Sequence, residues 1–268
     1  MRCIITLGCL LMFVCNAVAQ ERPSAWKRAE KRFAVGLDLG LSLFEPGRAI
    51  STQPPIDNIT SLQHLESWAG LMGEFAYDGL VLHLGWAYQT NSAVGQVSFA
   101  PYGTETFRAT SSANAFRVWR GRIGYEVRFL GEHFSFEPYL AVALNTAANT
   151  GTRSGSSTTG LMITAGSPDT VRTRVERTYV QLTRQTWTGG FGGRLAYRAG
   201  RMLLSVNAEY LAGARDWYAV DITASRSSTV NGTTYDAVRF VARADRWTFG
   251  LGIGIDLLRP KVPEAGIW

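Results

Sequence analysis

His133, Ser135 and Glu137 are the residues whose types and spacing come nearest to a catalytic group. Alternate residues of an extended strand share a face, so the imidazole of His133 would lie beside the hydroxyl of Ser135. A general base next to a hydroxyl nucleophile is the arrangement that nucleophilic catalysis requires. His133, however, follows directly on Leu130-Gly131-Glu132, which is typical of a tight turn. We therefore expect a strand end here and no enzyme.

Metal and thiol chemistry is also not expected. His64 and His83 are far apart in the sequence and offer no metal-ligand spacing. The chain's three cysteines all lie within the first 19 residues: Cys3, Cys9 and Cys15. We expect no catalytic residue, no metal and no cofactor.

Residues 1–19 have the pattern of a signal peptide. Arg2 supplies a positive charge, 4–14 are mostly apolar, and Ala-Val-Ala at 17–19 fits a cleavage site, so Gln20 would begin the mature chain. Without residues 1–19 the chain has no cysteine, which excludes a disulfide-stabilised fold and a thiolate nucleophile. We expect 20–32 to be an N-terminal segment in the periplasm.

Charged side chains and one histidine recur at alternate positions of segments that have strand character. On one face of a sheet they would either neutralise one another or line a channel. Since charges in a filled barrel are poorly solvated, we expect a structural plug of ion pairs, with a narrow or gated channel as the alternative. The set comprises Asp38, Glu74, His83, Arg120, Arg122, Glu126, Arg128, Glu137, Arg194, Glu209 and Asp256.

Arginine supplies nearly all of the basic charge. The chain has a formal net charge of +6 and only three lysines, Lys27, Lys31 and Lys261. A basic chain can bind nucleic acid, but an exported one is expected to meet anionic lipid headgroups instead. Guanidinium groups pair well with phosphate, so contact with lipopolysaccharide is one hypothesis and a solvated strand face with salt bridges is the other. The candidate residues are Arg172, Arg174 and Arg184.

Period-two alternation indicates the elements that hold these residues. In WTFGLGIGIDL (247–257), bulky apolar residues alternate with small or polar ones. A soluble sheet would bury the apolar face, whereas an outer-membrane barrel turns it towards lipid and the polar face towards the lumen. The pattern predicts eight strands, Phe33–Leu43, Trp68–Tyr77, Leu80–Gln89, Ala115–Phe129, Phe134–Asn145, Trp187–Tyr197, Met202–Leu211 and Trp247–Leu257.

The connections between these strands alternate in length. Tight turns separate strands two and three, four and five, and six and seven, while 44–67, 90–114, 146–186 and 214–246 are long. Bacterial barrels have short periplasmic turns and long extracellular loops. The segments 158–165, 171–182, 219–225 and 235–242 have strand character, which indicates hairpins beyond the membrane. A twelve-stranded barrel is the alternative.

Aromatic residues fall near both predicted rims, as expected of rings that prefer the headgroup zone. The outer group comprises Phe44, Trp86, Tyr88, Trp187, Tyr210 and Trp247, and the periplasmic group Phe33, Tyr77, Phe129, Phe134 and Tyr197.

The segments FSFEPYLAVAL (134–144) and WTFGLGIGIDL (247–257) resemble small outer-membrane barrels of the OmpA transmembrane-domain, OmpX and OmpW type. The resemblance spans Phe33 to Leu257. It implies an all-β, antiparallel up-and-down transmembrane barrel, located in the bacterial outer membrane and monomeric. The last strand looks like the signal that barrel-assembly machinery reads. One departure is the segment 258–268, which follows that strand as a periplasmic tail.

The function expected of such a barrel is structural or interactive, namely envelope integrity, adhesion or binding through extracellular loops. The alternatives are a narrow pore or a transporter of small hydrophobic molecules. A third is a lipid A-modifying enzyme, because His133-Phe134-Ser135 also resembles lipid A deacylases of the PagL type. The alternative fold is a soluble, lipocalin-like barrel, which would bury its apolar face.

Overall fold

The computed structural model describes residues 31–50, 59–90, 92–99, 103–110, 115–129, 133–147, 152–163, 170–229 and 232–258. The predicted signal peptide (1–19), nearly all of 20–32 and nearly all of 258–268 lie outside the described residues. No helix in the described part is long and apolar enough to cross a membrane.

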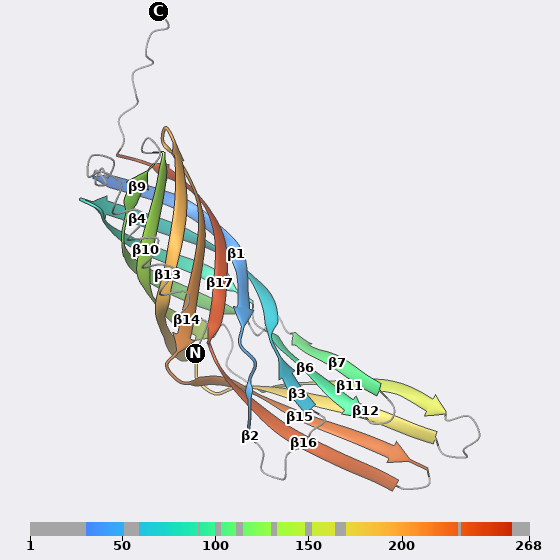
Figure 1. The fold of residues 1–268 in the computed structure, drawn as a ribbon. Coiled ribbons are helices and arrows are strands. Elements are labelled where there is room, and N and C mark those ends of the chain that lie inside the picture. The colour runs from blue at the N-terminus through green and yellow to red at the C-terminus, as the bar shows by residue number, and fades with distance from the viewer. Residues whose placement is uncertain are drawn as a thin grey trace, which may run out of the picture.

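Eight strands form a closed antiparallel barrel with up-and-down topology (Figure 1). Each strand pairs with the next along the chain, and the last pairs with the first, so the ring has no free edge. β9 (Val127–Phe129) continues the fourth strand beyond Glu126 and pairs with the fifth. The barrel strands are β1 (Arg32–Phe44), β4 (His64–Tyr77), β5 (Leu80–Gln89), β8 (Phe116–Tyr125), β10 (Phe134–Ala147), β13 (Gln185–Ala199), β14 (Met202–Gly213) and β17 (Arg246–Asp256).

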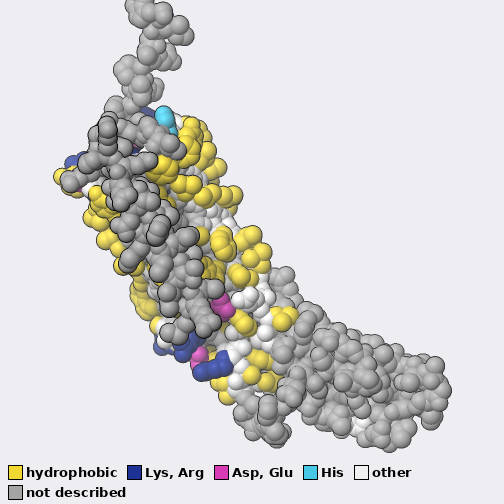
Figure 2. Space-filling model, viewed as in Figure 1, with side chains coloured by type: hydrophobic (Ala, Val, Ile, Leu, Met, Phe, Trp, Pro, Cys, Tyr) yellow, Lys and Arg dark blue, Asp and Glu magenta, His cyan; other side chains and the backbone are white. Residues whose placement is uncertain are grey.

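The barrel exposes its apolar face and buries its polar one. Leu251 of β17 and its partner Leu39 of β1 are 64% and 59% exposed, whereas Asp38 is 4% exposed. The same alternation holds around the ring, so the apolar residues form a band on the outer surface (Figure 2). The prediction of an eight-stranded barrel is confirmed, and the lipocalin-like alternative is wrong because the apolar face is outside.

The apolar band has the height of a membrane. On β10, outward-facing residues from Phe134 to Leu144 are apolar. At ~3.4 Å per residue these eleven residues span ~34 Å along the strand, or ~26 Å along the axis of a barrel whose strands tilt by ~40°. The outward-facing apolar band of outer-membrane barrels is ~25 Å tall.

The two ends of the barrel differ. At one end, here called the turn end, short connections join β4 to β5 and β13 to β14. From the other, the loop end, two further sheets extend as a head (Figure 1). One has the order β11-β12-β15-β16-β2 and the other β3-β6-β7. Their strands are β2 (Arg48–Ile50), β3 (Ile59–Leu62), β6 (Ser92–Phe99), β7 (Gly103–Thr110), β11 (Thr152–Ile163), β12 (Thr170–Gln181), β15 (Asp216–Ser228) and β16 (Gly232–Arg243).

The hairpins predicted within 146–186 and 214–246 are confirmed as β11–β12 and β15–β16. They pair with each other and with β2 rather than with barrel strands, so the twelve-stranded alternative is wrong. The hairpin β6–β7 and the short strands β2 and β3 were not predicted, because their sequences lack a clear apolar alternation.

The turn between β4 and β5 offers a test of backbone geometry. Gly79 has a φ of 88°, and a Cβ added to it would lie 2.7 Å from the ring of Tyr125. Gly200, in the turn between β13 and β14, has a φ of 59° and open space around it. We expect Gly79→Ala to lower the free energy of unfolding by about 1–3 kcal/mol, and Gly200→Ala by about 1 kcal/mol. Denaturant unfolding in detergent micelles measures both, and equal effects would contradict a role for the Tyr125 contact.

Candidate functional site

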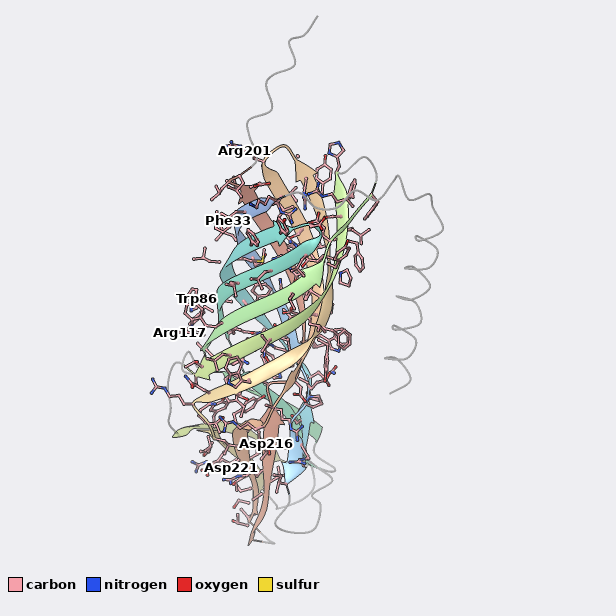
Figure 3. The ribbon with its side chains drawn as sticks, turned by 90° about the vertical axis from the view of Figure 1, so that its left-hand side faces the viewer. Phe33, Trp86, Arg117, Arg201, Asp216 and Asp221 are labelled. Carbon is pink, nitrogen blue, oxygen red and sulfur yellow. The ribbon has the colours of Figure 1, made fainter. Side chains whose placement is uncertain are left out.

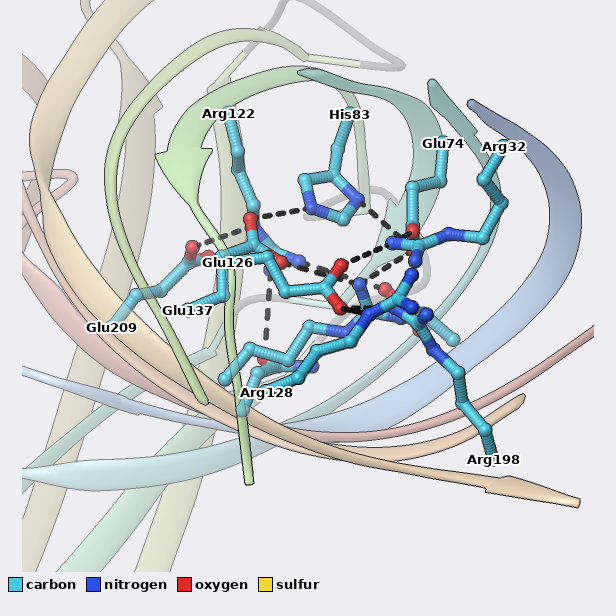
Figure 4. Close-up of polar contacts among 12 residues, drawn as sticks. Arg32, Glu74, His83, Arg122, Glu126, Arg128, Glu137, Arg198 and Glu209 are labelled. Atoms are coloured by element: carbon cyan, nitrogen blue, oxygen red, sulfur yellow. Dashed lines mark hydrogen bonds and ion pairs between the residues drawn. The ribbon is translucent and has the colours of Figure 1, made fainter. Parts of the chain in front are cut away.

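The inner face of the barrel holds a charged network, and the layer of this network nearest the turn end centres on Glu126. This carboxylate lies between β8 and β9, near the turn end, and is 2% exposed. It accepts hydrogen bonds from Arg32 at 2.6 Å and Arg128 at 3.0 Å, and from Arg198 (Figure 4). Three guanidinium groups from three parts of the barrel thus share one carboxylate.

A second set of contacts joins this layer to the barrel centre. Nη1 of Arg194 lies 2.6 Å from Oε2 of Glu74 and 3.4 Å from Oε2 of Glu137. Nε2 of His83 lies 2.7 Å from Oε1 of Glu137. Arg32 also contacts Glu74, so the set is continuous with that around Glu126.

The next layer towards the loop end centres on Glu209, which is 0% exposed. Its carboxylate lies 3.0 Å from Nε of Arg122 and 3.3 Å from Nη1 of Arg120. Each guanidinium also lies over an aromatic ring, that of Arg120 at 4.7 Å from Trp68 and that of Arg122 at 4.9 Å from Tyr139. Cation–π contact of this kind helps to stabilise a desolvated arginine.

Aromatic rings pack around Arg246 inside the loop end of the barrel. The guanidinium of Arg246 lies 5.7 Å from the ring of Phe44 and 5.7 Å from that of Phe116. It donates hydrogen bonds to Oδ1 of Asn145 at 2.9 Å and to the carbonyl of Ala244 at 3.0 Å. The ring of Trp217 packs edge-on against Phe116 at 4.7 Å.

Phe44 corrects one detail of the predicted outer aromatic belt. It is 0% exposed and faces the lumen, stacked on His64 at 5.1 Å. The physical reason is parity, since Phe44 follows outward-facing Leu43 and therefore points inwards with Ser42. Phe44 belongs to the closure of the barrel and not to its lipid-facing rim.

The buried charges nearly balance. Among the residues that the structure describes, seven arginines and six carboxylates are buried. Each unpaired ion would cost several kcal/mol after desolvation, which explains the close balance. Two small cavities lie within the network, one of about 20 Å³ beside Asp38, His83 and Arg122 and one of about 10 Å³ beside Glu74 and Arg194. A cavity of ~10–15 Å³ holds one water molecule.

The structure buries ten of the eleven residues that the sequence suggested for the interior. Asp256 differs, because it lies at the turn end of β17, is partly exposed and accepts a hydrogen bond from the backbone nitrogen of Leu258 at 3.1 Å. Three further arginines are buried with them that the sequence did not suggest, namely Arg32, Arg198 and Arg246. All three share the inward parity of their strands, so extending each predicted strand by one residue would have found them.

The His133–Ser135 pair does not form a catalytic arrangement. Nδ1 of the exposed His133 lies 3.2 Å from the carbonyl oxygen of Arg198, and Glu137 is engaged by His83 and Arg194. Ser135 is buried on the inner face, with no hydrogen bond to His133 among the described contacts. The described residues also contain no group of three or more His, Cys, Asp or Glu that could hold a metal ion.

The arginines proposed for lipopolysaccharide do not form one site. Arg174 lies in β12 and forms an ion pair with Glu176 at 2.8 Å. Arg184 lies after the end of β12, and the seven steps from Arg174 to Gln181 alone span ~23 Å of extended strand. The backbone of Arg172 is part of β12, and its side chain lies outside the described residues.

No protein-family model and no curated protein matches the chain. Among solved structures, it is similar to a major outer membrane protein from Thermus thermophilus, with 12% identity and a TM-score of 0.38 over 83% of this chain and 99% of that one. It is similar to the outer membrane protein OprG from Pseudomonas aeruginosa, with 10% identity and a TM-score of 0.43 over 85% of this chain and 98% of that one. The assignment of an eight-stranded closed barrel rests on the strand pairing itself.

Proposed function

We propose that the protein is a monomeric outer-membrane β-barrel with a closed lumen, which has a structural or surface-interaction role through the head at its loop end. In this proposal both termini and the turn end face the periplasm. Outer-membrane lipid and the barrel-assembly machinery are its partners, and it needs no cofactor.

The observation that carries the membrane location is the reversed polarity of the barrel. Leucines such as Leu251 and Leu39 are more than half exposed, while Glu126, Glu209 and Arg194 are almost completely buried. In water this arrangement would expose a large apolar surface and bury costly charges. In a bilayer the same arrangement is favourable, because lipid covers the apolar band.

The side chains that fill the barrel interior support a closed lumen, and with it a structural role over transport. Along the axis, the Arg246–Phe116 layer, the Glu209 layer and the Glu126 layer follow one another. The two cavities within the charged network, of about 20 and 10 Å³, each have room for about one water molecule and not for a continuous file. Eight-stranded barrels have an interior just wide enough for side chains to fill.

Fractionation and gel mobility test the membrane location. The full chain, expressed in a Gram-negative host, should sediment with the outer membrane and resist extraction by carbonate. Unheated samples should migrate differently from boiled ones, because a closed barrel resists unfolding in detergent. Recovery in the soluble fraction without any change of mobility on boiling would overturn the proposal.

Planar-bilayer recordings test the closed lumen. We expect the full chain to give no conductance above that of lipid alone, because both charged layers block the axis. Replacing Phe116 and Trp217 by Ala removes the aromatic closure, yet conductance should stay at baseline because the Glu209 and Glu126 layers remain. Stable stepwise conductance of the unmodified protein would instead favour a narrow pore.

A further inference from the structure

Three exposed arginines lie close together at the loop end of the barrel wall. They are Arg117 in β8, Arg184 just before β13, and Arg215 just after β14, and are here called the rim arginines. Arg117 pairs with Thr146 of β10, which in turn pairs with Gln185 of β13. Two strand spacings of ~4.8 Å therefore place Arg117 and Gln185 ~10 Å apart.

Arg215 reaches the same place from the other side. Its Nη2 donates a hydrogen bond to the carbonyl oxygen of Gln185 at 2.9 Å. Arg184 is the residue before Gln185, and its own carbonyl accepts a hydrogen bond from the backbone nitrogen of Ala147. Backbone pairing thus fixes Arg117 and Arg184 beside β10 and β13, and the side-chain hydrogen bond holds the guanidinium of Arg215 at Gln185. All three residues are exposed.

The rim arginines have no acidic counterpart among the described residues, and in this they differ from two arginines of the head. Arg239 and Arg174 of the head form ion pairs with Asp221 and Glu176. Two acidic residues beside the end of β14, Asp216 and Asp245, are engaged elsewhere. Asp216 lies 3.5 Å from both Arg48 and Arg243, and Asp245 accepts a hydrogen bond from the backbone nitrogen of Gly213 at 2.5 Å.

The rim arginines also lie at a defined depth. On β8, the outward-facing residue next to Arg117 is Trp119, which is 60% exposed, and on β13 the one next to Gln185 is Trp187, which is 54% exposed. Exposed tryptophans on the lipid face prefer the headgroup level. Figure 3 shows Arg117 at the loop end of the barrel, beyond Trp86 and before Asp216 and Asp221 of the head.

From this juxtaposition we propose that Arg117, Arg184 and Arg215 form a binding site for the phosphate groups of outer-leaflet lipids, with a diphosphorylated glycolipid such as the lipid A part of lipopolysaccharide as the best match. The proposal rests on the outer-membrane location proposed above. The backbone of Arg117 lies ~10 Å from Gln185, Arg184 directly precedes Gln185, and the guanidinium of Arg215 bonds to its carbonyl oxygen. Guanidinium groups gathered there without an acidic partner among the described residues offer bidentate hydrogen bonds to more than one phosphate. The site replaces the combination of Arg172, Arg174 and Arg184 suggested by the sequence, of which only Arg184 lies at this depth.

Native mass spectrometry of the full chain in detergent tests the site. The probes are diphosphorylated lipid A, its dephosphorylated form, and inorganic phosphate. We expect the triple variant Arg117→Ser/Arg184→Ser/Arg215→Ser to bind diphosphorylated lipid A about tenfold more weakly or worse, and the unmodified chain to show a similar loss with the dephosphorylated lipid. Arg174→Ser is the matched control, an exposed arginine of the head, and should leave binding unchanged.

Other outcomes distinguish a lipid phosphate from free phosphate, and failure of the arginine site from failure of the proposed membrane location. Competition by millimolar inorganic phosphate alone would show a free-anion site and overturn the lipid assignment. Unchanged lipid A binding by the triple variant would also overturn it. Heat-modifiable mobility of every variant establishes that the barrel is folded. If the chain fractionates with the outer membrane while the triple variant binds normally, the site is wrong and the proposed location stands.

Discussion

Replacing Glu126 by Gln should lower the free energy of unfolding by about 3–5 kcal/mol, because it leaves buried guanidinium groups without a counter-charge. Glu126 receives hydrogen bonds from Arg32, Arg128 and Arg198, and all four side chains are at most 9% exposed. Gln keeps the shape of the side chain but removes its negative charge. Denaturant unfolding in phosphocholine vesicles, followed by tryptophan fluorescence, measures the change.

Glu176→Gln is the control for this prediction. Glu176 pairs with Arg174, and both side chains are more than half exposed. The loss of an exposed pair costs about 0–1 kcal/mol. If Glu126→Gln proved as mild as Glu176→Gln, water would have to reach the arginines, and the closed lumen would be contradicted.

Replacing Leu251 by Arg should cost about 2–4 kcal/mol when the protein is in a bilayer, because the position lies near the middle of the apolar band. Leu251 is in the centre of β17 and 64% exposed. On a protein in water, a surface change of this kind usually stays within about 0.5 kcal/mol. The same vesicle unfolding experiment measures the effect.

Leu182→Arg is the matched substitution outside the band. Leu182 is 42% exposed and lies between β12 and β13, beyond the outward-facing tryptophans. We expect an effect of less than about 0.5 kcal/mol there. Equal effects at Leu182 and Leu251 would remove the evidence that lipid surrounds the barrel wall.

The sequence predicted the barrel well because, in a strand of a barrel wall, the direction in which each side chain points can be inferred from the neighbouring residues alone. Alternate residues face lipid and lumen, so the parity of Leu251 or Glu209 follows from its immediate neighbours without knowledge of any partner strand. The lengths of the connections then fixed the up-and-down order. The partners of each charge were not predictable, because the contact between Glu126 and Arg198 depends on the register of β9 with β10 and of β10 with β13.

The ends of the strands were less predictable than their centres. β4 begins at His64 and β13 at Gln185, before the predicted Trp68 and Trp187. At these ends the strands leave the apolar band and approach the head, so polar residues appear on both faces and the alternation is lost. Arg246 was assigned to a loop for this reason, although it is fully buried. The rim arginines were likewise unrecognised as a group, because strand register and not sequence distance brings Arg117 to Gln185.

The pairing of β1 with β17 has a consequence for the order of events in folding. The register runs from Ala34 with Asp256 to Phe44 with Arg246, so the two ends of the barrel sequence must meet. Until β17 has paired, β1 and β14 each keep an unpaired edge, and such edges are prone to aggregate. Contacts of such long sequence separation also make folding slow. The protein therefore needs protection for as long as it is incomplete, and loss of only its final strand should leave no stable intermediate.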